Sequence, residues 1–180
     1  MKNISDEALM TLVAKGDLEE MRHLYERYKA QIYSFSLMML RDKDLSRDIT
    51  QEVFYKIINS RHTYKGMKFA PWIYTIARNL CHDQFKLRAK MIAHHSGQEH
   101  LEDIVEEKQE SMGSDELLNQ ALNRLSLEDK EMILMSRFQK LKYTEIAEVA
   151  NTTVGAVKTR VHRALMKLKV EYFKIENDDM

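Results

Sequence analysis

Residues 144–168 read TEIAEVANTTVGAVKTRVHRALMKL, and their pattern determines how the second half of the chain folds. It contains a short helical pattern, a polar break at residues 151–153 and a longer helical pattern, which is the spacing of a helix-turn-helix. The apolar residues of the longer helix fall on one face, which must lie against a core. These residues are Val154, Val157, Val161, Leu165 and Leu168.

The opposite face of the longer helix is predicted to be exposed and cationic. Long cations at the edges of such a face contact phosphates, whereas side chains on its leading edge contact base edges in the major groove. We expect Arg163 to contact guanine. The alternative is an ordinary amphipathic helix whose Lys and Arg side chains face solvent. The predicted duplex contacts are Thr153, Lys158, Thr159, Arg160, His162, Arg163 and Lys167.

The composition favours an all-helical protein. The 180 residues include only 5 Gly and 1 Pro, whereas average usage would give about 13 and 9, so few hairpin turns are available. No apolar run approaches the roughly 18 residues of a membrane span, and the acidic N-terminus differs from a signal peptide. We therefore expect a cytoplasmic protein without membrane insertion.

The formal net charge of zero hides alternating segments. Residues 56–90 contain 8 basic and 1 acidic side chains, and residues 137–170 contain 8 and 2. Between them, residues 91–136 contain 3 basic and 11 acidic side chains. Salt screens charges beyond about 8 to 10 Å, so each basic segment acts locally. Two basic surfaces indicate two contacts with polyanions.

The apolar periodicity predicts two small helical domains joined by a flexible acidic linker. We expect domain boundaries at 1–90, 91–116 and 117–180. In the first domain, a capping box at Asp17 and Glu20 precedes a helix to about Leu40, a second helix follows, and Pro71 lies in the first turn of a third. In the second domain, Ser126 begins a helix ahead of the helix-turn-helix.

Aromatic and cationic side chains alternate in the first basic segment, which is typical of surfaces that hold single-stranded bases. Stacking contributes roughly 1 to 3 kcal/mol per base. Residues 64–68, with Gly66 between two predicted helices, form the predicted base-gripping loop. The alternative is that aromatic residues such as Trp72 belong to the core.

Three motifs occur in an order that resembles the sigma-70 family of initiation factors, in its small extracytoplasmic-function (ECF) type. DITQEVF at 48–54 resembles the segment that docks on the coiled coil of the largest subunit of RNA polymerase. FAPWIYTIARN at 69–79 resembles the promoter-melting helix, and residues 144–168 resemble the reader of the second domain.

This resemblance implies a transcription initiation factor that is not an enzyme and has no cofactor or metal. It implies binding to core RNA polymerase through Asp48, Gln51, Glu52 and Phe54, and duplex reading of the minus-35 element by the second domain. Members of the family are commonly silenced by an anti-sigma factor, a partner that this sequence by itself neither requires nor excludes. The residues implied in opening the minus-10 element are Tyr64, Lys65, Met67, Lys68, Arg78, Asn79, Lys86 and Arg88.

Two other function classes stay open. A metal enzyme would use His82, His94, His95 or His100 with Cys81 or the linker acids, but the sequence contains no HExxH and no metal-loop spacing of acids. A polymerase-independent regulator would bind duplex DNA through the helix-turn-helix and would use its first domain to dimerise or to sense a ligand.

Overall fold

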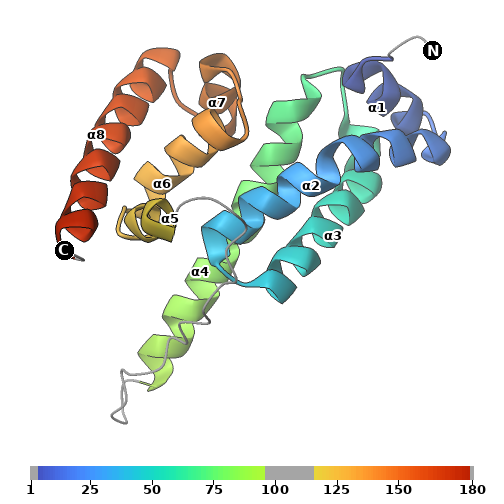
Figure 1. Cartoon of the computed structure of the whole chain (residues 1–180). Coiled ribbons are helices and arrows are strands. Elements are labelled where there is room, and N and C mark those ends of the chain that lie inside the picture. Colours follow the sequence, from blue (N-terminus) through green and yellow to red (C-terminus); the bar gives the residue numbers. More distant parts are fainter. Residues whose placement is uncertain (1–3, 96–115, 179–180) are drawn as a thin grey trace.

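The computed structural model describes residues 4–95 and 116–178, and this part of the chain is built of helices without strands (Figure 1). The all-helical prediction is therefore confirmed. The first half contains α1 (Asp6–Ala14), α2 (Met21–Leu40), α3 (Lys43–Ser60) and α4 (Phe69–His95), with 3-10 turns η1 (Leu18–Glu20) and η2 (Arg61–Thr63). The second half contains α5 (Glu116–Asn123), α6 (Leu127–Ile133), α7 (Tyr143–Val149) and α8 (Val154–Asp178), with a π-helical turn η3 (Leu134–Phe138) after α6.

α1 is a helix that our sequence analysis did not predict. The Ser5 hydroxyl accepts a hydrogen bond from the Ala8 amide at 3.2 Å and so caps its N-terminus. Its apolar face, Leu9, Met10 and Val13, is buried against the first half of the chain. The expected capping box at residues 17–20 is absent, because these residues form η1 and Asp17 makes no side-chain cap.

α2 and α3 form an antiparallel hairpin with a tight connection. Arg41 ends α2 with a left-handed φ of 59° and donates its amide to the Leu37 carbonyl. Asp42 then caps α3, accepting from the Leu45 amide at 2.9 Å. These two residues turn the chain so that the apolar faces of both helices meet.

α4 connects the two halves. It packs against α2 and α3 of the first half and against α7 of the second half. Figure 1 shows its C-terminal part continuing beyond the other helices of the first half. The helix ends at His95, so the predicted start of the linker at residue 91 is too early. The rest of the predicted linker, up to residue 115, lies outside the described residues.

One apolar cluster extends through both halves of the chain. It includes Phe35 of α2 and Tyr74 of α4, whose rings pack edge to face at 5.7 Å, together with Met135 of η3 and Ile146 of α7. The two sets of helices are therefore packed together. No helix within residues 4–95 and 116–178 is long and apolar enough to cross a membrane.

Candidate nucleic-acid interface

The helix-turn-helix is formed by α7, a turn at residues 150–153 and α8. Asn151 adopts a left-handed φ of 48°, which reverses the chain. The Thr153 hydroxyl accepts from the Ala156 amide at 3.2 Å and caps α8. Val157 and Val161 of α8 are buried, as the sequence pattern predicts.

The face of α8 opposite this apolar stripe is exposed. All six predicted DNA contacts within the helix are exposed, on this face or along its flanks: Lys158, Thr159, Arg160, His162, Arg163 and Lys167. Thr153 is also exposed, at the beginning of the helix. A helix whose N-terminal end is exposed and whose outer face is cationic can enter the major groove of DNA.

Lys167 forms an ion pair with an acid in its own half of the chain. Its Nζ lies 2.5 Å from Oδ2 of Asp129, which also accepts from the Ser126 hydroxyl at 2.9 Å. Burial by itself would raise the pKa of Asp129, but the hydrogen bonds from Lys167 and Ser126 outweigh it and lower this pKa. If Lys167 contacts a DNA phosphate, it therefore exchanges the Asp129 carboxylate for that phosphate.

The predicted base-gripping loop divides into a buried anchor and an exposed tip. Tyr64 is only 7% exposed, and its hydroxyl donates to the Met67 carbonyl at 2.5 Å. Lys65, Met67 and Lys68 are exposed, and Gly66 adopts a positive φ of 77° that closes the turn. The structure therefore places the Tyr64 side chain in the core, against Trp72, rather than among the accessible groups.

The predicted minus-10 residues of α4 occupy different surroundings. Asn79 and Lys86 are exposed, and Lys86 pairs with Asp83 at 3.2 Å. The Arg88 guanidinium lies 3.6 Å from Oδ2 of Asp42 at the α2–α3 turn. Arg78 instead points to the second half of the chain.

Arg78 donates from Nε to Oε1 of Glu131, whose side chain is only 1% exposed. His82 lies on the other side of this carboxylate, with 3.3 Å between its Nε2 and Oε2 of Glu131. That pair has the distance of an ion pair but not hydrogen-bond geometry, so both atoms lack a hydrogen-bond partner within the described part of the chain. Tyr74 adds a second polar contact between the halves, donating to Oε1 of Gln139 at 2.8 Å.

The predicted polymerase-docking residues lie on α3. Asp48 and Gln51 are exposed, and Glu52 pairs with Lys56 at 3.6 Å. Phe54 is only 5% exposed and packs edge to face on Tyr25 at 4.8 Å. The structure thus places three of the four side chains toward the surface and Phe54 in the core.

Comparison with known proteins assigns the two halves separately. Residues 24–91 match the family model "Sigma-70 region 2", and residues 115–168 match "Sigma-70, region 4". The ECF RNA polymerase sigma factor SigW of Bacillus subtilis is 31% identical over 170 residues, covering 87% of this chain and 91% of SigW. The chain belongs to the sigma-70 family, in its ECF type.

Other relatives agree with this assignment. The ECF RNA polymerase sigma factor BldN of Streptomyces coelicolor is 30% identical over 91% of this chain and 66% of its own length. The sigma factor RpoE of Bartonella quintana, solved with the anti-sigma factor NepR, has a TM-score of 0.71, 21% identity, and coverage of 87% of this chain and 98% of that chain. CnrH, solved with the cytosolic domain of CnrY, has a TM-score of 0.70, 19% identity, and coverage of 92% and 95%. Both likenesses support the two-part helical fold.

Within the described residues, the side chains that a metal enzyme would need are not gathered, and His100 lies outside these residues. Burial raises the pKa of the Cys81 thiol to about 12, so the thiol is protonated at neutral pH and is a poor ligand or nucleophile. His82 faces Glu131 rather than other ligands. Within residues 4–95 and 116–178, no three His, Cys, Asp or Glu side chains form a group that could hold a metal ion.

Sequence reasoning missed two acids that contact α4, Glu131 and Glu7. Glu131 lies among the apolar residues of α6, where a charged side chain is buried only when another element supplies its partner. Glu7 follows the Ser5 cap of a helix whose apolar residues recur at positions 9, 10 and 13. Each acid was visible in the sequence, but its partner, 53 or 62 residues away, was not.

Proposed function

We propose that this sigma factor binds core RNA polymerase and directs it to specific promoters, where it reads the minus-35 element as duplex and melts the minus-10 element. The observation that carries the proposal is the presence of both sigma regions in one chain, each with an exposed cationic surface. Region 2 bears the base-gripping loop, and region 4 bears the outer face of α8. Two such surfaces suit promoter DNA in which one element is duplex and the other is single-stranded.

The exposed face of α8 is the proposed reader of the minus-35 element. Arg163 is central on this face and is the proposed guanine contact, because a guanidinium matches O6 and N7 of guanine in a bidentate arrangement. Around it lie Lys158, Thr159, Arg160, His162 and Lys167. The exposed Thr153, directly before α8, also belongs to this surface. The flanking cations are proposed to contact phosphates.

The minus-10 element is the proposed ligand of the loop and of the adjoining face of α4. The accessible tip of the loop is formed by Lys65, Met67 and Lys68. Tyr64 anchors the loop to the core. Asn79, Lys86 and Arg88 extend the cationic surface along α4, and Arg78 joins them when it leaves Glu131. Exposed cations beside an apolar side chain such as Met67 suit an unpaired base with its phosphate.

Core polymerase is the proposed partner of α3. Asp48 and Gln51 are exposed on the same face, with Glu52 beside them, and they offer polar groups to a helical partner. Phe54 supports this surface from within the core. The resemblance of this segment to the family's docking motif supports the coiled coil of the largest polymerase subunit as the proposed partner.

The partner protein of RpoE supports an anti-sigma factor as a further partner here. RpoE was solved with the anti-sigma factor NepR. A protein that binds both halves of this chain would cover both DNA surfaces at once. We place the protein in the cytoplasm, where RNA polymerase acts, and we propose two domains, the first ending with α4 and the second beginning with α5.

Transcription with purified core polymerase of the source bacterium tests the proposal. Fragmented genomic DNA is transcribed with and without the full chain, and the 5′ ends of the RNA are mapped. We expect new starts that share two upstream sequence elements, with permanganate-reactive thymines in the downstream element. An absence of new starts with active core polymerase would overturn the proposed function.

The polymerase-independent regulator makes a different prediction for the same preparation. A regulator binds its operator without polymerase, usually as a dimer on paired half-sites. We expect the full chain alone to bind the selected promoters weakly and without paired half-sites. Steep salt dependence does not discriminate the two, because both release counterions from DNA.

A further inference from the structure

We propose that Glu7 is a positioning residue for promoter opening, because its carboxylate caps the first amide of α4 and thereby fixes the base-gripping loop that precedes this helix. Glu7 precedes the residues that match the region 2 model, which begin at residue 24. The inference rests on the proposed function, since the loop position affects transcription only if this sigma factor opens promoters.

The first residues of α4 need a partner from elsewhere in the chain. The side chain of Lys68, directly before the helix, has donors but no acceptor, and Pro71 in the first turn has no N–H. The Phe69 amide donates to Oε1 of Glu7 at 3.3 Å. A negative charge at this end of a helix is also favourable because of the helix dipole. Glu7 thus takes the place of a local Ser or Asp cap.

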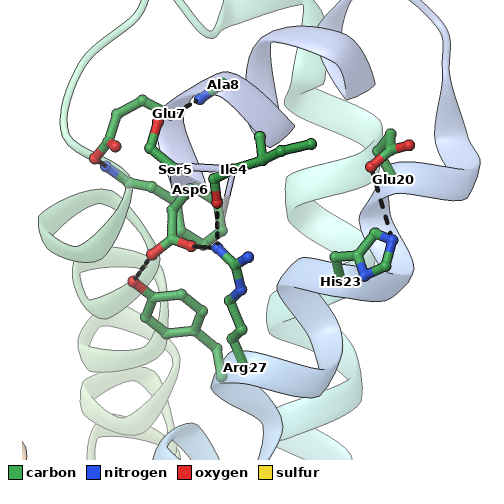
Figure 2. A network of polar contacts seen from close by, with 10 residues as sticks. Ile4, Ser5, Asp6, Glu7, Ala8, Glu20, His23 and Arg27 are labelled. Carbon is green, nitrogen blue, oxygen red and sulfur yellow. Dashed lines mark hydrogen bonds and ion pairs between the residues drawn. The ribbon is translucent and has the colours of Figure 1, made fainter. Parts of the chain in front are cut away.

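The neighbours of Glu7 are held to α2, as Figure 2 shows. Asp6 accepts from Nη1 of Arg27 at 2.5 Å and from the Tyr28 hydroxyl at 2.6 Å. Arg27 also donates to the Ile4 carbonyl at 2.9 Å. With its apolar face buried, α1 is therefore fixed at its first turn, and the Glu7 carboxylate is presented to α4 from a rigid position.

Aromatic contacts carry the effect of the cap into the loop. The Phe69 ring lies edge to face against Tyr28 at 5.1 Å and against Trp72 at 6.2 Å. Trp72 lies 5.4 Å from Tyr64, whose hydroxyl holds the Met67 carbonyl. The exposed tip of the loop thus lies between two anchored ends, and Glu7 fixes one of them.

The surroundings of Tyr64 place Glu7 close to this loop. Burial, followed by the charges of Glu7 and Asp6, raises the pKa of Tyr64 to about 12. The competing explanation is therefore electrostatic, with Glu7 acting on Lys65, on Lys68 or on DNA phosphates through its charge. Gln at position 7 keeps the acceptor oxygen without the charge, and Ala removes both, so these substitutions separate the two explanations.

The test compares Glu7→Ala, Glu7→Gln and the matched control Glu20→Ala in the full chain. Glu20 belongs to the same part of the fold, and its Oε2 lies 3.9 Å from Nε2 of His23 (Figure 2). Each protein is assembled with core polymerase, and open-complex formation is followed on a selected promoter as duplex and as a template already unpaired in the minus-10 element. Affinity for core polymerase is measured in parallel.

We expect Glu7→Ala to slow opening of the duplex by roughly threefold to thirtyfold, the range that loss of a helix cap corresponds to. On the unpaired template, and in polymerase affinity, it should stay within about twofold of wild type. Glu7→Gln and Glu20→Ala should open the duplex nearly as fast as wild type. Normal opening by Glu7→Ala, equal losses in Ala and Gln, or equal losses on both templates would each overturn the inference.

Hydrogen exchange at the Phe69 amide tests the cap without polymerase. We expect faster exchange in Glu7→Ala, near-normal exchange in Glu7→Gln, and unchanged exchange in the middle of α4. Unchanged exchange at Phe69 in Glu7→Ala would overturn the inference by itself. If wild type forms no open complex while the cap behaves as expected, the proposed function fails and the structural role of Glu7 remains.

Discussion

Arg78 of α4 donates from its Nε to the carboxylate of Glu131 in α6, so a side chain predicted to contact promoter DNA is held by the other half of the chain. The Glu131 side chain is 1% exposed and that of Arg78 is 23% exposed. A carboxylate this deeply buried is unfavourable unless a cation or hydrogen-bond donors compensate it. While this contact holds, the Nε of Arg78 is not available to DNA.

Arg78→Ala is expected to decrease the free energy of unfolding in urea by about 3 kcal/mol, because it leaves a buried carboxylate without its main partner. Glu131→Gln removes the charge and should recover much of this loss when both substitutions are combined. Lys86→Ala, at a 72% exposed side chain on the same helix, should change stability by less than about 0.5 kcal/mol. Strictly additive effects of the two substitutions would show that the ion pair contributes nothing.

Substitutions of Gln51 and Phe54 should distinguish loss of polymerase binding at the surface of α3 from loss of stability in the core. Gln51→Arg is expected to leave the free energy of unfolding within about 0.5 kcal/mol of wild type and to weaken core polymerase binding roughly tenfold. Phe54→Ala leaves a cavity beside Tyr25 and should destabilise the fold by about 3 to 5 kcal/mol. Urea unfolding measures the stability of each variant, and a titration with core polymerase measures its affinity. Undiminished polymerase binding by Gln51→Arg would contradict the proposed docking surface.

The sequence predicted the architecture well wherever periodicity is long. The stripe of α8 and the Ser126 cap of α6 both appear as expected, since each depends on residues that are close in sequence. Local patterns were less reliable at element ends. α4 runs on to His95 through exposed residues such as Lys90 and Ile92, which do not form a buried apolar face.

The candidate site was predictable only in part. Exposure of the α8 cations follows from the opposite apolar stripe, whereas Tyr64 and Phe54 are buried by contacts from other helices that no local pattern reports. The pairing of Arg78 with Glu131 requires the two halves to be packed together. Local sequence therefore predicts which face is polar, but not which polar groups are already occupied.

Arg163→Ala is expected to weaken binding to the selected promoter by about 1 to 3 kcal/mol, with a smaller effect on scrambled DNA. Lys158→Ala should weaken both alike and reduce the salt dependence by about one counterion. Lys167→Ala should also act on both sequences, but less than Lys158→Ala, because Lys167 already pairs with Asp129. Binding of the polymerase complex at several salt concentrations measures these effects. Equal losses on cognate and scrambled DNA for Arg163→Ala would remove its assignment to guanine.

Lys130 makes the stability of the fold depend on pH in the alkaline range. Burial, followed by the charge of Arg41, lowers its pKa from the ordinary 10.5 to about 8. Between these values the unfolded chain binds more protons than the folded chain, so stability rises with pH. Below pH 8 both states are protonated and the full unfavourable effect of burial remains. From pH 7 to 9.5, the free energy of unfolding should gain about 2 kcal/mol from this group.

Comparison with Lys130→Met isolates this group, because titration of all other residues cancels in the difference. The free energy of unfolding of the variant minus that of wild type should decrease by about 2 kcal/mol between pH 7 and 9.5. Loss of the hydrogen bond from Lys130 to Asn123, at 2.9 Å, adds an offset that does not change with pH. Lys174→Met, at a 58% exposed side chain on α8, should show a constant difference from wild type. A pH-independent difference for Lys130→Met would mean that Lys130 stays hydrated in the folded chain.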